Sequence, residues 1–119
     1  MRLKDLLGLD RSVKPLTRDE GMKILERDRY RCQYCGLDGL AQFENSLIMS
    51  VDFVVPRKRQ GTKEETNLLT ACRPCNLLKG NRKFVDVEEA KAYVLQRRAE
   101  LRKEWEEKVA RFRTNSASG

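Results

Sequence analysis

Residues 52–76 read DFVVPRKRQGTKEETNLLTACRPCN, and this stretch decides the fold. It ends in a Cys-x-x-Cys pair, Cys72 and Cys75, and a second pair, Cys32 and Cys35, lies upstream. Two such pairs suit a structural zinc ion, because each tight turn presents two thiolates and four thiolates complete a tetrahedral site. The spacing therefore predicts that zinc ties the intervening chain into one unit.

The chain is short enough to gain from such a staple, because 119 residues allow one small domain. Its four cysteines occur without a signal-peptide pattern or a long apolar segment, so we expect reduced thiols, a cytoplasmic location and no membrane partner. Two disulfides are the alternative, and the pair spacing favours zinc over them. The chain has no histidine. All zinc ligands would therefore be cysteines, and no imidazole can serve as a general base.

Positive charge is concentrated on one segment. The chain carries a formal net charge of +7, and residues 57–83 hold eight Lys or Arg against two Asp or Glu. Residues 1–56 are balanced at nine against nine, and residues 84–119 are nearly balanced at eight against seven. A basic segment between neutral ones is typical of a protein that contacts a phosphate backbone. The alternative interpretation is an ordinary solvated loop.

The N-terminal part is predicted to hold one helix. Residues 1–16 form a separate segment in which leucines recur at partly helical spacing. Thr17 or Asp19 is expected to cap a helix that runs to about Asp28. The folded domain itself is predicted to begin with this cap and to span residues 17–84.

The middle of the chain predicts a strand, a polar loop, a second strand and a short helix, at about residues 46–55, 58–66, 68–71 and 73–79. Asp52 interrupts the first strand, and Gly80 would end the helix. Residues 37–46 are expected to form a loop. The pattern as a whole indicates an α+β fold with a compact ββα unit around one zinc ion.

A long C-terminal helix is predicted over residues 85–113. Asp86 supplies an acid at its N-cap and Glu89 follows three residues later, as in a capping box. Residues 114–119 are small and polar and are expected to be disordered. Apolar residues recur on one face of the helix. This apolar face would pack in the core or against a second copy, so a homodimer through the terminal helices is left open. The residues on this face are Ala90, Val94, Leu101, Trp105, Val109 and Phe112.

Four sequence blocks together resemble a known family. The blocks are CQYCG at residues 32–36, VDFVVPR at 51–57, NLLTACRPCN at 67–76 and KGN at 79–81. In this order they are similar to the HNH endonuclease family, specifically its zinc-knuckle members, over about residues 19–84. The resemblance implies a ββα-metal fold, in which a hairpin and a helix hold one catalytic divalent ion against a scissile phosphate. It also implies that the zinc is structural.

The resemblance assigns roles to four residues. Asp52 matches the family's metal-binding carboxylate, and Asn76 matches the His or Asn that completes the metal site. Both supply oxygen donors, which suit Mg²⁺ or Mn²⁺. Asn67 matches the middle Asn, which in the family orients the base through the loop. Phe53 falls where the family has its first His, the general base that activates water. A phenyl ring cannot accept a proton, so this role is vacant.

The vacancy leaves the activity open. General-base catalysis contributes typically ~10²–10⁴-fold, so a metal site without it would retain slow hydrolysis. Glu44, Glu64 and Glu65 are candidate substitutes, and the spacing selects none of them. Without the family register, Asp52 would be a strand-edge acid, and the two asparagines would be ordinary turn and cap residues.

Two functions follow from the sequence. The first is a divalent-metal-dependent HNH endonuclease that nicks DNA and is weakened by the missing histidine. The second is a catalytically inactive, nuclease-derived zinc module that binds DNA. Both have duplex DNA as the partner, contacted through the basic side chains Arg57, Lys58, Arg59, Lys79, Arg82 and Lys83.

Overall fold

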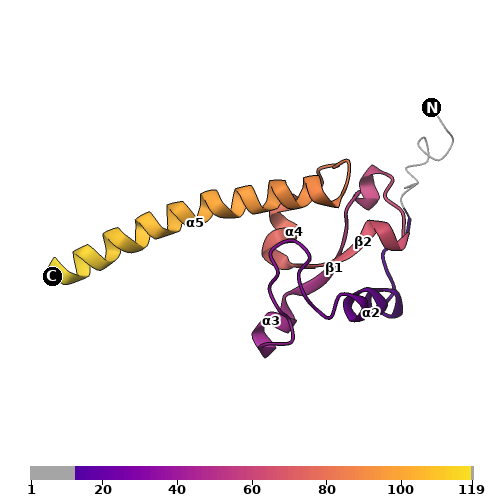
Figure 1. The fold of residues 1–119 in the computed structure, drawn as a ribbon, viewed down its shortest axis with the longest axis horizontal. Coiled ribbons are helices and arrows are strands. Elements are labelled where there is room, and N and C mark those ends of the chain that lie inside the picture. The colour runs from indigo at the N-terminus through magenta and orange to yellow at the C-terminus, as the bar shows by residue number, and fades with distance from the viewer. Residues whose placement is uncertain (1–12, 119) are drawn as a thin grey trace, which may run out of the picture.

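A two-stranded antiparallel sheet lies at the centre of the fold (Figure 1). The computed structural model describes residues 13–118. Strand β1 spans Met49–Phe53 and strand β2 spans Leu68–Cys72, and Asp52 pairs with Leu69 in their register. All of β2 is buried, whereas β1 is mostly half-exposed. The loop that joins the two strands contains the first part of the basic segment. It also contains two short 3₁₀ helices, Arg57–Arg59 and Glu65–Asn67.

Helix α4 spans Arg73–Lys79 and follows β2 without a loop. Pro74 falls in its first turn, where a missing backbone N–H removes no intrahelical hydrogen bond. Gly80 ends the helix with a φ of 62°, which glycine adopts without the strain that a side chain would bring. The helix packs against both strands. The predicted α+β fold with its ββα unit is therefore confirmed.

Helix α2 spans Arg18–Arg27 and is held against the sheet by its C-terminal end. Of the two predicted caps, Thr17 is the one that caps it, in a capping box with Glu20. The Asp28 carboxylate, directly after the helix, accepts a 2.8 Å hydrogen bond from the backbone N–H of Thr70 in β2. The predicted Leu-rich segment at residues 1–9 lies outside the described residues.

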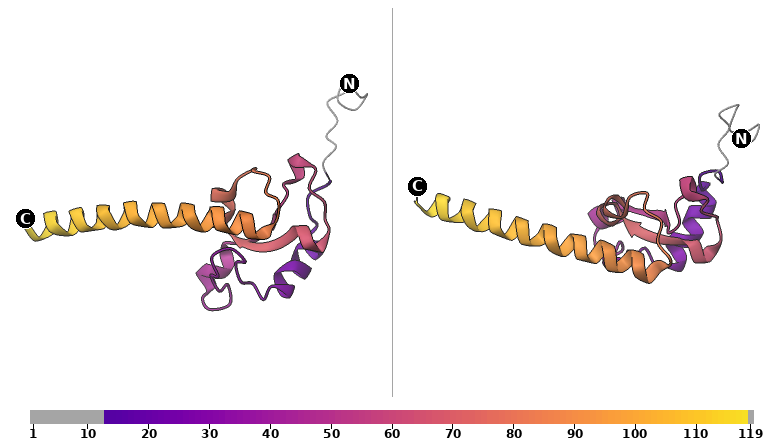
Figure 2. Two further views of the ribbon diagram at one scale, coloured as in Figure 1. Left: turned by 45° about the horizontal axis from the view of Figure 1, so that its top comes forward. Right: turned by 90° about the horizontal axis from the view of Figure 1, so that it is seen from above.

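Helix α5 spans Val87–Ser118, and only its first turns pack on the rest of the protein. Ala90 and Val94 are fully buried in a core that includes the cysteines, whereas Trp105 and Phe112 are 57% and 70% exposed. At 1.5 Å per residue the helix is about 48 Å long, and most of it projects from the body in every view (Figures 1 and 2). The predicted apolar face is thus core at one end and surface at the other.

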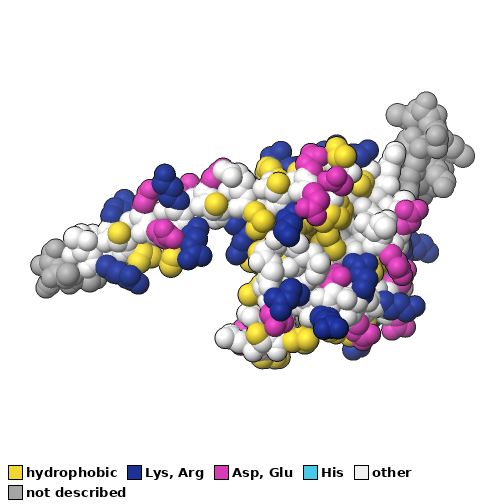
Figure 3. All heavy atoms as spheres, in the orientation of Figure 1, with side chains coloured by type: hydrophobic (Ala, Val, Ile, Leu, Met, Phe, Trp, Pro, Cys, Tyr) yellow, Lys and Arg dark blue, Asp and Glu magenta, His cyan; other side chains and the backbone are white. Residues whose placement is uncertain are grey.

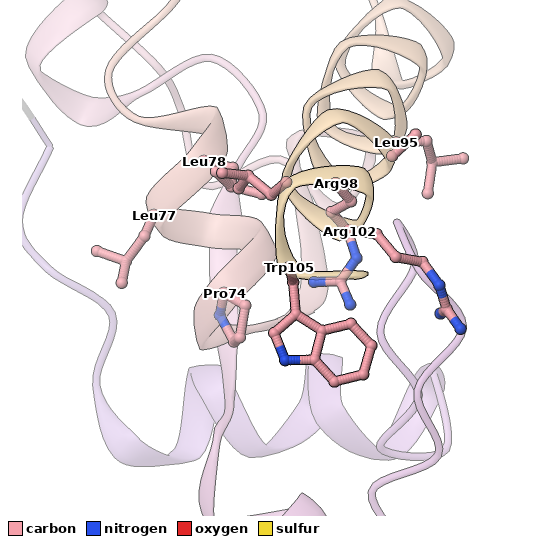
Figure 4. Close-up of a pocket in the computed structure, with 9 residues that line it drawn as sticks. Pro74, Leu77, Leu78, Leu95, Arg98, Arg102 and Trp105 are labelled. Carbon is pink, nitrogen blue, oxygen red and sulfur yellow. The ribbon is translucent and has the colours of Figure 1, made fainter. Parts of the chain in front are cut away.

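Where α5 leaves the body, it forms a groove with α4 of about 650 Å³. Pro74 and Leu77 come from α4, and Leu95, Arg98 and Trp105 come from α5 (Figure 4). A homodimer through the terminal helices stays a prediction. Among the described residues, no helix combines the length and the apolar character that crossing a membrane requires.

Two regions differ from the sequence prediction. The stretch predicted as a loop contains a short helix, α3, over Phe43–Leu47, and its Phe43 is 72% exposed. A five-residue helix with no side-chain cap leaves little periodicity for a sequence to show. At the other end, α5 continues to Ser118, beyond the predicted boundary at residue 113. Helix ends that pack on nothing are the boundaries that sequence patterns define least well.

Candidate functional site

The four cysteines come together from two turns at one end of the sheet. Cys32 and Cys35 belong to the turn after α2, Cys72 ends β2, and Cys75 lies in the first turn of α4. Their four Sγ atoms lie within 4.8 Å of one another. Cys32, Cys72 and Cys75 are 1% exposed or less, and Cys35 is half-buried. All four are free thiols, so the disulfide alternative is wrong.

The cluster has the dimensions of a tetrahedral zinc site. Zn–S bonds of about 2.3 Å place neighbouring sulfur atoms about 3.8 Å apart, and the Cys35 and Cys72 Sγ atoms are 3.7 Å apart. Two N–H groups point at the sulfurs, as they do around metal-bound thiolates. The backbone N–H of Cys35 lies 3.5 Å from Cys32 Sγ, and Arg98 of α5 donates to Cys75 Sγ at 3.7 Å. The residues present therefore fit zinc.

The thiols also show why a cation is needed. The hydrogen bond to Cys32 raises the pKa of the Cys72 thiol to about 11. Hydrogen bonds to the sulfurs of Cys32 and Cys72 raise the pKa of the Cys75 thiol further. The pKa of Cys32 lies well below its usual range, because its sulfur accepts hydrogen bonds from Cys72 and Cys75. Three or four adjacent thiolates cannot exist without a positive charge among them. A metal ion would replace the protons that now separate the sulfurs.

Asp52 is the one buried carboxylate of β1, with 6% of its surface exposed. The Tyr34 hydroxyl donates a 2.6 Å hydrogen bond to its Oδ2, and the Lys79 ammonium lies 3.4 Å from the same oxygen. Lys79 also donates to the Phe53 carbonyl at 3.0 Å. Among the described residues nothing donates to Asp52 Oδ1. One carboxylate oxygen is thus anchored and the other is left for a further ligand.

Burial and charge act in opposite directions on this pair. Burial raises the pKa of the Asp52 carboxyl and lowers the pKa of the Lys79 ammonium, and the attraction between the two groups opposes both changes. Burial also raises the pKa of the Tyr34 phenol, and the negative charge of Asp52 adds to the effect. Tyr34 therefore stays protonated and remains a donor to the carboxylate.

Asn67 holds the loop that follows β1. Its Oδ1 accepts from the Val55 N–H at 2.8 Å, and its Nδ2 donates to the carbonyls of Val55 and Thr62 at 3.2 and 2.9 Å. Its own backbone carbonyl accepts from the Val54 N–H at 2.9 Å. The chain directly after Phe53 is therefore fixed by one asparagine.

A family model described as HNH endonuclease matches residues 32–82. Residues 32–82 form an HNH endonuclease domain. No curated protein and no solved structure matches the chain. The matched segment begins at Cys32 and contains the sheet, both cysteine pairs, α4 and nearly all of the basic segment. The predicted family is thereby confirmed, and action on nucleic acid of the nuclease type is what an HNH domain indicates.

Asn76 of this HNH domain lies on α4 near β1. It is half-buried and lines a cavity of about 250 Å³ together with Ser50. Ser50 and Asp52 are two apart in β1 and share a face, and Asn76 and Lys79 are three apart in α4 and are neighbours on that helix. Among the described residues, however, no hydrogen bond joins Asn76 to Asp52.

Phe53 is the last residue of β1 and is half-buried. Because successive side chains of a strand point to opposite faces, its ring leaves the strand on the other side from Asp52. Of the candidate substitute bases, Glu64 lines a cavity of about 460 Å³ with Asn67, and Glu65 lines another of about 320 Å³ with Leu68. Within residues 13–118, none of the three candidate carboxylates contacts Asp52.

The basic side chains of the HNH domain come from two loops that meet. Arg59 Nε donates to the Asn81 carbonyl at 3.3 Å, and Arg59 and Lys83 line the same cavity. Arg82 lies over the Tyr93 ring at 4.8 Å. Of the remaining two predicted contacts in the first loop, Lys58 is exposed and Arg57 Nε donates to the Val13 carbonyl.

Lys79 is a correction to the predicted set of DNA contacts. Its side chain is 0% exposed and its ammonium is paired with Asp52, so it cannot reach a phosphate in this structure. Cys75 and Lys79 are four residues apart in α4 and share one face of the helix. Because Cys75 must face the metal centre, this spacing could have indicated that Lys79 points inward.

Tyr34 and Arg98 are two functional neighbours that sequence reasoning missed. Tyr34 could have been noticed, because it lies between the two cysteines of the first knuckle and must be close to the metal centre. Arg98 lies 23 residues after Cys75, and nothing in the sequence connects the two. Its contact depends on how α5 crosses α4.

Proposed function

We propose that the protein is a DNA endonuclease of the HNH family that cleaves phosphodiester bonds with the help of Mg²⁺ or Mn²⁺. One observation carries the proposal: Asp52 is held by Oδ2 at the centre of a zinc-anchored ββα unit, and its Oδ1 accepts no hydrogen bond from the described residues. An oriented carboxylate oxygen of this kind is a donor that hard divalent cations prefer.

The HNH domain would divide the work among four side chains. Asp52 and Asn76 would hold the divalent ion, which when bound polarises the phosphate and stabilises the leaving oxygen. Asn67 fixes the backbone after Phe53 and thereby the end of β1. Position 53 would face the attacking water, and its phenyl ring leaves that water without a base. We therefore expect slow nicking.

Duplex DNA is the proposed substrate because of the two basic loops. The exposed side chains of Lys58, Arg59, Arg82 and Lys83 would bind phosphates, together with Arg57. Acidic and basic side chains are interspersed along α5 on the face drawn in Figure 3, so α5 offers no comparable basic surface there. Contacts to phosphates alone carry no base specificity.

A second candidate is an inactive DNA-binding module, and two observations favour it. Phe53 cannot act as a base, and the Lys79 ammonium beside Asp52 repels a divalent cation. In this case the domain would keep the zinc centre and the basic loops and would bind DNA without cleaving it.

The experiment that tests the proposal is nicking of supercoiled plasmid by the zinc-loaded protein. We expect slow nicking with Mn²⁺ that a chelator stops and that Asp52→Asn abolishes. Tyr30→Phe serves as a control for handling, because the Tyr30 hydroxyl contacts Met22 and no site residue. Tight DNA binding with no Asp52-dependent nicking would replace the proposal with the inactive module.

A further inference from the structure

Tyr34 links the zinc centre to the proposed catalytic carboxylate. It lies between the zinc ligands Cys32 and Cys35, and its side chain is 1% exposed. Its hydroxyl donates to Asp52 Oδ2 at 2.6 Å across 18 residues of sequence. A knuckle closed on zinc cannot shift without moving this ring, so the direction of the carboxylate depends on the zinc centre.

The Lys79 ammonium contacts the same oxygen, but its effect on a cation is different. Both groups fix Oδ2, which lies 2.6 Å from the Tyr34 hydroxyl and 3.4 Å from Lys79 Nζ. Tyr34 is neutral, so it orients the carboxylate and adds no charge. Lys79 is a cation with no solvent exposure, so it neutralises the carboxylate that a divalent ion would bind.

We propose that Tyr34 is a positioning residue for the divalent ion, and that Lys79 is an internal counter-ion that keeps the affinity for that ion low. The Tyr34 hydroxyl holds Asp52 so that Oδ1 faces the ion. The Lys79 ammonium balances the negative charge of Asp52 while no ion is bound. This inference rests on the proposed function, because it concerns the ion that Asp52 would hold.

The two roles predict changes of opposite sign. Loss of a hydrogen bond to a metal ligand typically lowers the affinity for the metal by about 10–100-fold. Tyr34→Phe removes the hydroxyl and keeps the ring, so we expect weaker ion binding by about that factor. Lys79→Gln removes the charge and keeps a donor for the Phe53 carbonyl. A divalent ion would then supply the missing counter-charge, so we expect tighter binding.

The experiment is titration of the zinc-loaded 119-residue protein with Mn²⁺, in which electron paramagnetic resonance measures the free ion. The variants are Tyr34→Phe, Lys79→Gln and Asp52→Asn. Tyr30→Phe is the matched control for the lost hydroxyl, because Tyr30 precedes the same knuckle and contacts Met22 instead. Lys103→Gln, on the exposed part of α5, is the control for the lost charge. Zinc content is measured for every protein.

Opposite shifts for Tyr34→Phe and Lys79→Gln, with unchanged controls and one zinc throughout, would support the inference. Equal weakening by both variants would overturn it, because a role in stability alone has that result. If Tyr34→Phe does not fold, a Lys79→Gln protein that binds Mn²⁺ no better than wild type still overturns it. Failure of the proposed function has a separate signature: wild type and Asp52→Asn would bind Mn²⁺ equally, and the inference would fall with it.

Discussion

The Asn67 side chain binds both backbone polar groups of Val55. Its Oδ1 accepts from the Val55 N–H at 2.8 Å, and its Nδ2 donates to the Val55 carbonyl at 3.2 Å. The two residues are 12 apart and face each other across the base of the basic loop. This pair explains how a loop of 14 residues between β1 and β2 keeps a defined start. It also fixes the backbone two residues after Phe53.

Asn67→Ala should destabilise the domain. It removes three side-chain hydrogen bonds and leaves the Val55 groups, which are half-buried, without these partners. We expect the free energy of unfolding to fall by about 1–3 kcal/mol. Asn115→Ala, at the exposed far end of α5, is the control and should change it by less than about 0.5 kcal/mol. Denaturant unfolding followed by circular dichroism measures both, and equal stability of the two variants would contradict the role of Asn67.

Zinc removal should unfold the ββα unit. Cys32, Cys72 and Cys75 lie inside the core cluster, so the metal centre and the apolar core are one structure. We expect one zinc per chain by metal analysis, and loss of β1, β2 and α4 protection in hydrogen exchange after chelation. A chelated protein that keeps the exchange pattern of the zinc form would show that the metal is dispensable.

Zinc binding should release protons. In the metal-free cluster the pKa of Cys72 is raised to about 11, and that of Cys75 is raised as well, so both thiols are protonated at neutral pH. Binding of zinc must displace these protons, and zinc affinity should therefore fall as the pH is lowered. Calorimetric titration in buffers of different ionisation enthalpy counts the protons. Affinity that is independent of pH between about pH 6 and about pH 8 is the contrary result.

Much of this arrangement is predictable from sequence where the signal is local. Thr17 or Asp19 as a cap predicts the start of α2, Gly80 predicts the end of α4, and the cysteine spacing predicts the metal centre. The inward direction of Lys79 and the contact of Arg98 with Cys75 are not local. They depend on which helix faces cross the sheet and the metal centre, and a basic residue in a basic segment reads as a surface residue until the packing is known.

DNA affinity should depend on the first basic loop. Replacing Arg57, Lys58 and Arg59 together with Ala should weaken binding and make the dependence on salt shallower by about two to three units of the log–log slope. The control replaces Lys103, Lys108 and Arg111, which are exposed on α5 and change the net charge equally. Fluorescence anisotropy with duplex DNA at several salt concentrations measures both slopes. Identical slopes would mean that charge alone, and not this loop, determines binding.

In the proposed endonuclease, the residue that the HNH site lacks is a base at position 53. The expectation rests on the family resemblance, in which position 53 carries the base next to the carboxylate at position 52 that would hold the ion. The most direct measurement is the rate of plasmid nicking with Mn²⁺ by wild type, Phe53→His, and Phe53→His combined with Asp52→Asn. We predict that the histidine raises the rate by about 10²–10⁴-fold and that the second change abolishes the gain. A Phe53→His protein that binds Mn²⁺ and DNA but nicks no faster than wild type would contradict the claim.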